Sequence, residues 1–363
     1  MKHVALACTM LATACGAAQA QTNVTIYGVL DAGVEHLSNV GGSGSLTRMP
    51  GLGVSVPSRL GFRGTEDLGG GLKAIFTLES GFGTDSGTLN QGGRFFGRQA
   101  FVGLSGDWGS VTLGRQYSML FWSQLDADIL GPNAYGAGSL DSYLPNARVD
   151  NSIAYRGTFN GLTVGATYSF GRDTVNANSP SGTNCAGESA TDKSACRQWS
   201  AMVKYDAPTW GASAAVDEIR GGAGAFAGLN ASDMKDRRTT VAGWAKFAAL
   251  KVGGGVIARS NDATPVTRRS NLWYLGASYP ITPALVLDGQ VFKLNYKHSD
   301  NQALLYAIRG TYHFSKRTAL FATAGHIAND GSLALSVSGA AAGGGTTAGG
   351  SQTGVAVGVR HSF

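Results

Sequence analysis

Apolar and polar side chains alternate along short stretches from one end of the chain to the other. In NVTIYGVLDAGVE the even positions from Val24 to Val34 are apolar or glycine, whereas Asp31 and Glu35 occupy odd positions. The same period recurs in NSIAYRGTF, LTVGATYSF and QALLYAIRGTYHF. A period of two is that of a β-strand, and about ten residues let a tilted strand cross the hydrocarbon core of a membrane. The pattern therefore predicts strands that span a bilayer.

The segments between these units are of two kinds. Short turns, such as NG at 160–161 and SKRT at 315–318, alternate with longer segments. The longer segments are 38–53, 83–92, 118–149, 172–197, 221–237 and 330–352. Counting between the breaks predicts about sixteen strands, the second beginning near residue 54 and the fourth near 93. Short turns at one end and long loops at the other predict an all-β fold, a transmembrane up-and-down antiparallel β-barrel.

Composition leaves two main classes of fold. The chain has 54 glycines and 15 phenylalanines but only 14% charged residues, well below the usual quarter or so. After residue 20 no uncharged apolar run approaches the length of a membrane helix. A soluble glycan-binding β-sandwich and a membrane barrel both remain open. The arginines on the polar faces favour the barrel, because a water-filled lumen hydrates them without a burial cost.

The first residues are typical of an export signal. Lys2 precedes a mostly apolar stretch, and Ala18-Gln19-Ala20 matches an A-x-A cleavage site. We expect residues 1–20 to be a signal peptide that is removed, and residues 21–363 to be the barrel domain. A lipid anchor on Cys15 is the alternative. Removing Lys2 lowers the formal charge from +6 to +5.

Two cysteines remain after residue 20, Cys185 and Cys196. An even number of cysteines in an exported chain favours a disulfide, since the compartments outside the cytoplasm preserve such bonds. We expect these two to be bonded, closing the segment CAGESATDKSAC. Two free thiols in a loop are the alternative.

Five runs resemble the general porins of Gram-negative bacteria, in particular the trimeric, sixteen-stranded type of beta-proteobacteria. The runs are VTIYGVLDAGV (24–34), SRLGFRGTEDLGGGLKAIFTLESGF (58–82), GRQAFVGLSGDWGSVTLGRQY (97–117), RVDNSIAY (148–155) and GVRHSF (358–363). The resemblance implies a homotrimer in the cell outer membrane. It also implies that each subunit is a water-filled channel for passive diffusion of ions and small hydrophilic solutes, with the third long loop folded into the lumen.

The resemblance also implies a constriction, in which arginines of the wall oppose acidic groups of the third long loop. The motif positions that match are Arg59, Arg98 and Arg148, and two further candidates are Arg63, which shares the face of Arg59, and Arg115, whose face the alternation does not fix. The loop, residues 118–147, carries only three charges: Asp126, Asp128 and Asp141. Which of them reaches the constriction stays open. Because arginines outnumber aspartates here, we expect an anion-selective channel.

The chain ends on an alternating strand, GVAVGVRHSF. We expect it to pair with the strand at 24–34, since an open edge in a membrane leaves backbone groups without hydrogen bonds. On that strand Arg360 and Ser362 would face the lumen. The resemblance implies that Phe363 is the signal read by the barrel assembly machinery before insertion among outer-membrane lipids.

The sequence contains no motif that would indicate an enzyme. A hydrolase would need a nucleophile with a histidine and an orienting partner, but the histidines are scattered and G-x-S-x-G, H-E-x-x-H and CxxC are absent. We expect no enzyme activity, cofactor, metal site or nucleic-acid partner. An adhesin or autotransporter barrel is disfavoured, because the strand pattern begins at Val24 with no passenger before it.

Overall fold

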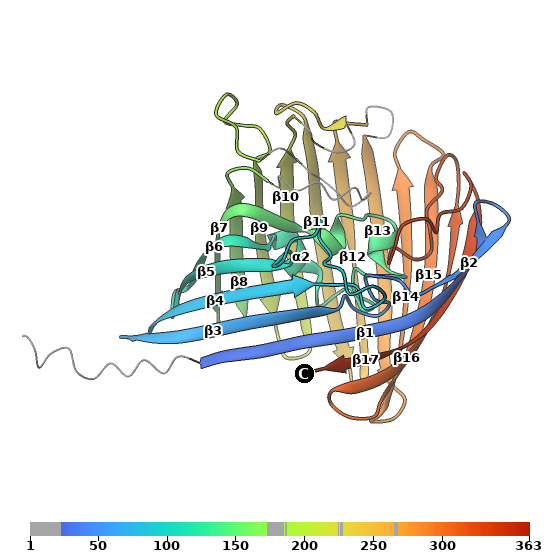
Figure 1. Cartoon of the computed structure of the whole chain (residues 1–363), viewed down its shortest axis with the longest axis horizontal. Helices are drawn as coiled ribbons and strands as arrows, with labels where there is room; N and C mark the ends of the chain where they lie inside the picture. Colours follow the sequence, from blue (N-terminus) through green and yellow to red (C-terminus); the bar gives the residue numbers. More distant parts are fainter. Residues whose placement is uncertain (1–22, 173–184, 186, 224, 226–227, 265–267) are drawn as a thin grey trace, which may run out of the picture.

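The computed structural model describes residues 23–172, 185, 187–223, 225, 228–264 and 268–363, and its strands form one closed antiparallel sheet (Figure 1). The signal peptide expected at 1–20 lies outside the described residues. The strands are β1 (Asn23–Val40), β2 (Gly44–Arg48), β3 (Arg59–Gly69), β4 (Leu72–Gly81), β5 (Gln99–Gly106), β6 (Gly109–Tyr117), β7 (Arg148–Phe159), β8 (Leu162–Ser169), β9 (Gln198–Asp206), β10 (Trp210–Arg220), β11 (Lys235–Phe247), β12 (Leu250–Asn261), β13 (Arg269–Pro280), β14 (Leu285–Tyr296), β15 (Gln302–His313), β16 (Thr318–Asn329) and β17 (Ser351–Ser362).

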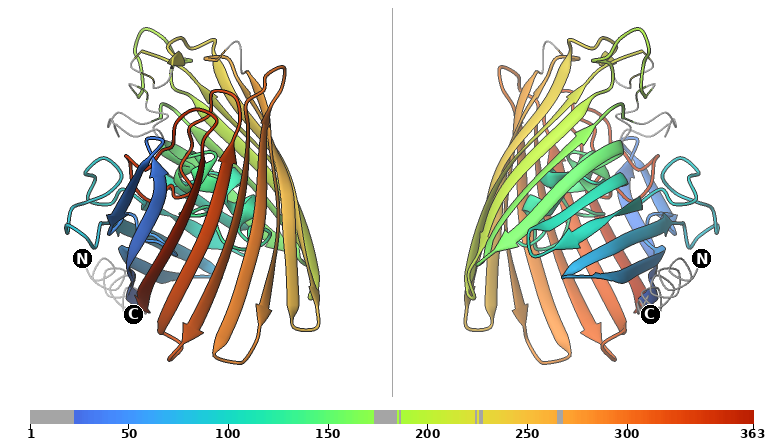
Figure 2. Two further views of the ribbon diagram at one scale, coloured as in Figure 1. Left: turned by 90° about the vertical axis from the view of Figure 1, so that its right-hand side faces the viewer. Right: turned by 90° about the vertical axis from the view of Figure 1, so that its left-hand side faces the viewer.

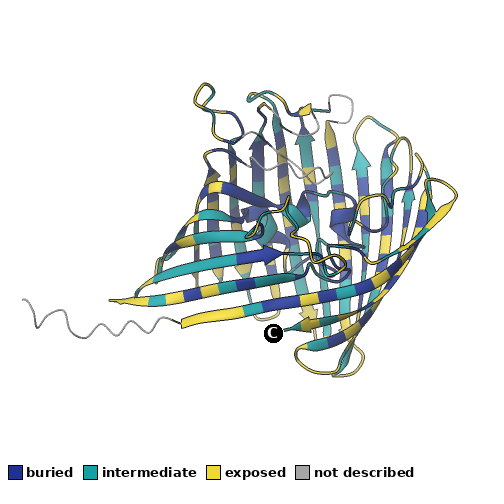
Figure 3. Cartoon of the chain, in the orientation of Figure 1, coloured by how far each residue is buried: buried dark blue, intermediate teal, exposed yellow. Residues whose placement is uncertain are grey.

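The alternation of the sequence becomes an outer and an inner face. On β1 the outward Val24 and Ile26 are 53% and 60% exposed, while Asp31 and Glu35 are fully buried on the inner side. Buried and exposed positions alternate in the same way along most other strands (Figure 3). The apolar outer face fits a hydrocarbon environment, and the polar inner face surrounds the lumen.

The ring closes through β1. Residues 29–37 of β1 pair with β17 on one edge, and its other edge pairs with β3 in its first half and β2 in its second. The seventeen strands therefore occupy sixteen places, since β2 and β3 share one. The strands are tilted, and the longer loops gather at the end opposite the short turns (Figure 2). The sixteen-strand antiparallel barrel predicted from the sequence is confirmed.

Two predicted strand boundaries were wrong. The strand expected near residue 54 begins at Arg59, and the one expected near 93 begins at Gln99. Residues 54 and 55 instead fold inward, where their backbone N–H groups donate to the carboxylate of Asp31. Residues 82–90 fold back on themselves through a bridge between Phe82 and Leu89. Half of the segment 38–53, expected to be a loop, extends β1 and forms β2.

The segment between β6 and β7 lies inside the ring of strands (Figure 1). It contains α2 (Met119–Gln124) and two short 3-10 helices, η1 (Ala137–Ser139) and η2 (Leu144–Asn146). Leu120, Leu130 and Tyr135 of this segment belong to one buried apolar cluster with wall residues such as Phe292 and Leu305. The apolar residues of the inner wall thus hold the segment, hereafter the inner loop (118–147), against β9–β16.

The disulfide expected between Cys185 and Cys196 is present. It packs beside Gly222, where a Cβ would lie 2.8 Å from the Cys196 sulfur. Across the described residues no helix is long and apolar enough to cross a membrane. In the same part of the chain no three His, Cys, Asp or Glu side chains gather as metal ligands would.

Candidate constriction site

Five polar side chains converge where five neighbouring strands face the inner loop. Arg59 begins β3, Glu79 is near the end of β4, Arg98 immediately precedes β5, Tyr117 ends β6 and Arg148 begins β7. The pairing register brings them to one level, because Arg59 lies opposite Gly81, Glu79 opposite Gln99, and Tyr117 opposite Arg148. The wall cluster of Arg59, Glu79, Arg98, Tyr117 and Arg148 is thus built by strand register.

Hydrogen bonds connect the members of the wall cluster. Arg98 donates to Glu79 at 2.7 Å and to the Tyr117 hydroxyl at 2.7 Å, and Arg148 donates to that hydroxyl at 3.0 Å. The Arg59 guanidinium lies 3.6 Å from Glu79. Within the described chain no carboxylate forms an ion pair with Arg148, which lies over the Tyr117 ring instead. One carboxylate therefore stands beside three guanidinium groups, and the cluster keeps a positive charge.

The wall cluster faces a cavity of about 390 Å³ between the barrel wall and the inner loop. Charged residues that line the cavity are Arg59, Arg98, Arg148, Arg309, Arg360, Glu79 and Asp128. Five guanidinium groups thus face two carboxylates. Arg360 faces the lumen as the alternation of the last strand predicts, and it donates to the Ser55 hydroxyl at 3.3 Å.

Comparison with known proteins identifies the family of this chain. The family model of Gram-negative porins matches residues 7–332. The chain belongs to the Gram-negative porin family. Its location is accordingly the outer membrane of a Gram-negative bacterium, and the resemblance inferred from the five sequence runs is confirmed.

Individual relatives agree with this family. The porin is 32% identical to outer membrane porin protein 32 of Delftia acidovorans over 378 residues, which cover 100% of both chains. It is 38% identical to an outer membrane porin protein of Bordetella pertussis, over 47% of this chain and 48% of that relative. Its fold is similar to that of the anion-selective porin from Comamonas acidovorans, with a TM-score of 0.75 and 26% identity over 94% of this chain and all of that one. These relatives are channels rather than enzymes.

The inner loop presents one of its three aspartates to the cavity. Asp128 lines it, whereas Asp126 forms an ion pair with Lys204 of β9 and Asp141 forms one with Arg238 of β11. Of the three aspartates predicted from the sequence, Asp128 is the one that lines this cavity.

Asp128 is buried without a matching partner. The residue is 6% exposed, and neither carboxylate oxygen has a hydrogen bond within the described residues. Burial raises the pKa of Asp128 to about 6, although the positive charge of Arg309 acts in the opposite direction. Its charge therefore changes in the range just below neutral pH.

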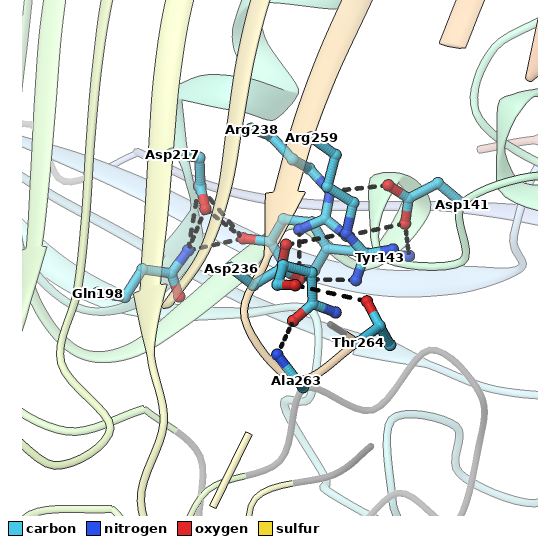
Figure 4. A network of polar contacts seen from close by, with 10 residues as sticks. Asp141, Tyr143, Gln198, Asp217, Asp236, Arg238, Arg259, Ala263 and Thr264 are labelled. Atoms are coloured by element: carbon cyan, nitrogen blue, oxygen red, sulfur yellow. Dashed lines mark hydrogen bonds and ion pairs between the residues drawn. The ribbon is translucent and has the colours of Figure 1, made fainter. Parts of the chain in front are cut away.

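A polar network fastens the second half of the inner loop to the opposite wall (Figure 4). Arg238, which is 1% exposed, donates to both oxygens of Asp141 at 2.7 and 3.0 Å and to Asp236 at 3.0 Å. Arg259 donates to Asp236 at 2.8 Å. The Tyr143 hydroxyl donates to Asp217 at 3.1 Å. These bonds fix the position of the loop in the lumen.

The structure does not bring two of the predicted arginines to the cavity. Arg63 shares the inner face of β3 but lies over the Tyr27 ring, 5.3 Å from its centroid, outside the lining. Arg115 sits where the β6–β7 register shifts, and it pairs with Asp150. We leave both out of the constriction proposed below.

Sequence reasoning missed Glu79, Tyr117 and Arg309 as cavity residues. Glu79 lies within the matching run 58–82, but it is 19 residues from Arg98 in the chain, and only the β4–β5 register brings the two side chains together. Tyr117 closes the run 97–117. Arg309 stands on the polar face of QALLYAIRGTYHF, opposite the apolar positions, but nothing local gives its height in the barrel.

Proposed function

We propose that this porin conducts ions and small hydrophilic solutes by passive diffusion, with a preference for anions, and that its constriction consists of Arg59, Arg98 and Arg148 opposite Asp128. The observation that carries this proposal is the excess of five guanidinium groups over two carboxylates around one narrow cavity. Fixed charge in a narrow aqueous passage raises the local concentration of ions of the opposite sign. The 26%-identical porin from Comamonas acidovorans, described as anion-selective, supports the same preference.

Because Asp128 faces the wall cluster, the electric field between them points across the passage. Positive and negative groups on facing sides of a passage orient dipolar solutes as they enter. The hydrogen bonds of Arg98 and Arg148 to Tyr117 hold their guanidinium groups in place without neutralising them. The pore thus keeps a fixed positive wall.

The remaining assignments rest on the family resemblance. We propose that the mature chain begins at Gln21 and assembles as a homotrimer among outer-membrane lipids. We also propose that the barrel assembly machinery recognises Phe363, whose strand lies at the closing edge of the sheet.

Reconstitution in a planar bilayer tests the channel. Stepwise conductance in groups of three is expected, with a reversal potential in a KCl gradient that has the sign of anion preference. Arg59→Gln should reduce the anion-to-cation permeability ratio roughly sevenfold, because one unit charge about 7 Å away in water changes the energies of anions and cations by about RT each, in opposite directions. Arg63→Gln, on the same face of β3 but outside the cavity, is the matched control. Absence of conductance steps contradicts the channel, and equal effects of the two variants contradict the constriction.

A further inference from the structure

Two lysines lie side by side on adjacent strands of the lumen wall, away from the arginine cavity. Lys246 of β11 and Lys251 of β12 are direct cross-strand partners next to the short turn that joins these strands. On β11 the even-numbered residues up to Ala242 are buried inside, while Val241 and Phe247 are exposed outside, so Lys246 faces the lumen. Like charges placed directly opposite destabilise a sheet. This pair therefore costs folding energy unless an anion neutralises it.

Trp244 holds both ammonium groups in one place. The Nζ atoms of Lys246 and Lys251 lie 5.4 and 5.5 Å from the centroid of its ring. The indole N–H donates to Asp206 at 3.3 Å, which orients the ring. Gly211 leaves room for it, since a Cβ there would lie 2.5 Å from the indole nitrogen. The indole ring thus makes cation–π contacts with both ammonium groups.

The carboxylates around the pair form their ion pairs with other residues. Asp126 and Asp206 both form ion pairs with Lys204 of β9. Neither Lys246 nor Lys251 has an ion pair among residues that the structure describes. The cavity described above is lined by β3–β7, β15, β17 and the inner loop, and it includes no residue of β11 or β12. The two positively charged sites are thus separate.

We propose that Lys246, Lys251 and Trp244 form a second anion-binding site, at the short-turn mouth of the channel, for a dianionic oxyanion group such as phosphate or paired carboxylates. The inference rests on the channel proposed above and adds a solute class to it. An anion between the two ammonium groups relieves their repulsion, and two point charges release it more readily than a bidentate arginine would. The site therefore concentrates anions at one mouth without trapping them.

Titration of the detergent-folded porin with inorganic phosphate, followed by tryptophan fluorescence, tests the site. A saturable change is expected in the wild type and is lost in Trp244→Phe. The double variant K246Q/K251Q should weaken the apparent affinity about fivefold, because each exposed charge pair contributes several tenths of a kcal/mol. K246R/K251R keeps the charges and should retain binding. The matched control K73Q/K316Q removes two lysines that are not cross-strand partners and should also retain it.

Two outcomes overturn the proposal. One is an equal loss of affinity in K246Q/K251Q and in K73Q/K316Q, and the other is an undiminished fluorescence change in Trp244→Phe. Heat-modifiable migration on gels confirms that each variant is folded. Reversal potentials in KCl separate this inference from the proposed function: anion preference with no phosphate response refutes the second site alone, and a folded protein without conductance refutes the channel.

Discussion

Gly28 and Phe363 exchange two backbone hydrogen bonds, each 3.1 Å long. A Cβ on Gly28 would lie 2.3 Å from the Cζ atom of the Phe363 ring, so the ring rests directly on the glycine. Because β1 and β17 are the strands that close the ring, this contact completes the seam of the barrel. Closure matters in a membrane, since an open edge leaves backbone groups without partners.

Deletion of Phe363 should impair assembly more than conductance. The deletion removes both seam hydrogen bonds, whereas the constriction residues keep their surroundings. Gly28→Ala should have the same effect through steric conflict with the ring, and Gly310→Ala, where a Cβ meets nothing within 4 Å, is the matched control. The fraction of folded trimer on unheated gels and the single-channel conductance measure the two effects. A normal trimer yield in both seam variants would refute the role of this contact.

Glu79→Gln should increase anion preference and lower stability. The substitution removes the carboxylate shared by Arg98 and Arg59, so the anion-to-cation permeability ratio should rise roughly sevenfold. Loss of a buried partner by Arg98 should cost about 3 kcal/mol. Reversal potentials and the thermal transition of the trimer measure these effects. Glu218→Gln, in an outward ion pair with Arg237, is the control and should leave the reversal potential unchanged. An unchanged potential in Glu79→Gln would contradict the proposed constriction.

The sequence predicted the barrel because its decisive constraint is local. A strand between lipid and water must alternate, and each strand carries that pattern by itself. The two boundary errors arose where non-local contacts decide. Asp31 accepts the N–H groups of Val54 and Ser55 from a distant part of the chain, and no local pattern announces that interaction.

The candidate site was predictable only in part. Alternation gives the face of a residue but not its height in the barrel, so the alternation alone did not separate Arg59 from Arg63. Four residues of strand separate them by about 13 Å, and only Arg59 reaches the cavity. The orientation of Asp128 depends on how the inner loop packs against β13–β15. Such packing involves contacts across most of the chain, which sequence spacing does not encode.

Anion preference should fall as pH rises through about 6. Above the raised pKa of Asp128 this carboxyl is charged and opposes the wall arginines, whereas below it the group is neutral. Reversal potentials between about pH 4.5 and 8 measure the change, a window that spans the pKa of this group. Asp128→Asn should abolish it and keep the high anion preference at all pH values. Asp126→Asn, in a loop carboxylate paired with Lys204, is the control and should retain the transition. A transition that survives in Asp128→Asn would assign it to another group.

Asp141→Asn should loosen the inner loop without changing the charges at the cavity. It removes the ion pair that joins the loop to Arg238, but Arg238 keeps its ion pair with Asp236, so the loss of stability should be about 1–2 kcal/mol.

Burial alone would raise the pKa of Asp141, yet Arg238 and Arg259 hold it at about 2. A depressed pKa stabilises the fold above the ordinary value of 3.8, and the contribution is lost only as pH falls through about 2. The open-channel current noise of the wild type should therefore stay low at about pH 4. The noise of the variant should be higher than that of the wild type at every pH. Asp262→Asn, which removes an ion pair with Arg268 outside the inner loop, should leave the noise at the wild-type level. Equal noise in the wild type and in Asp141→Asn would show that apolar packing of the loop alone fixes its position.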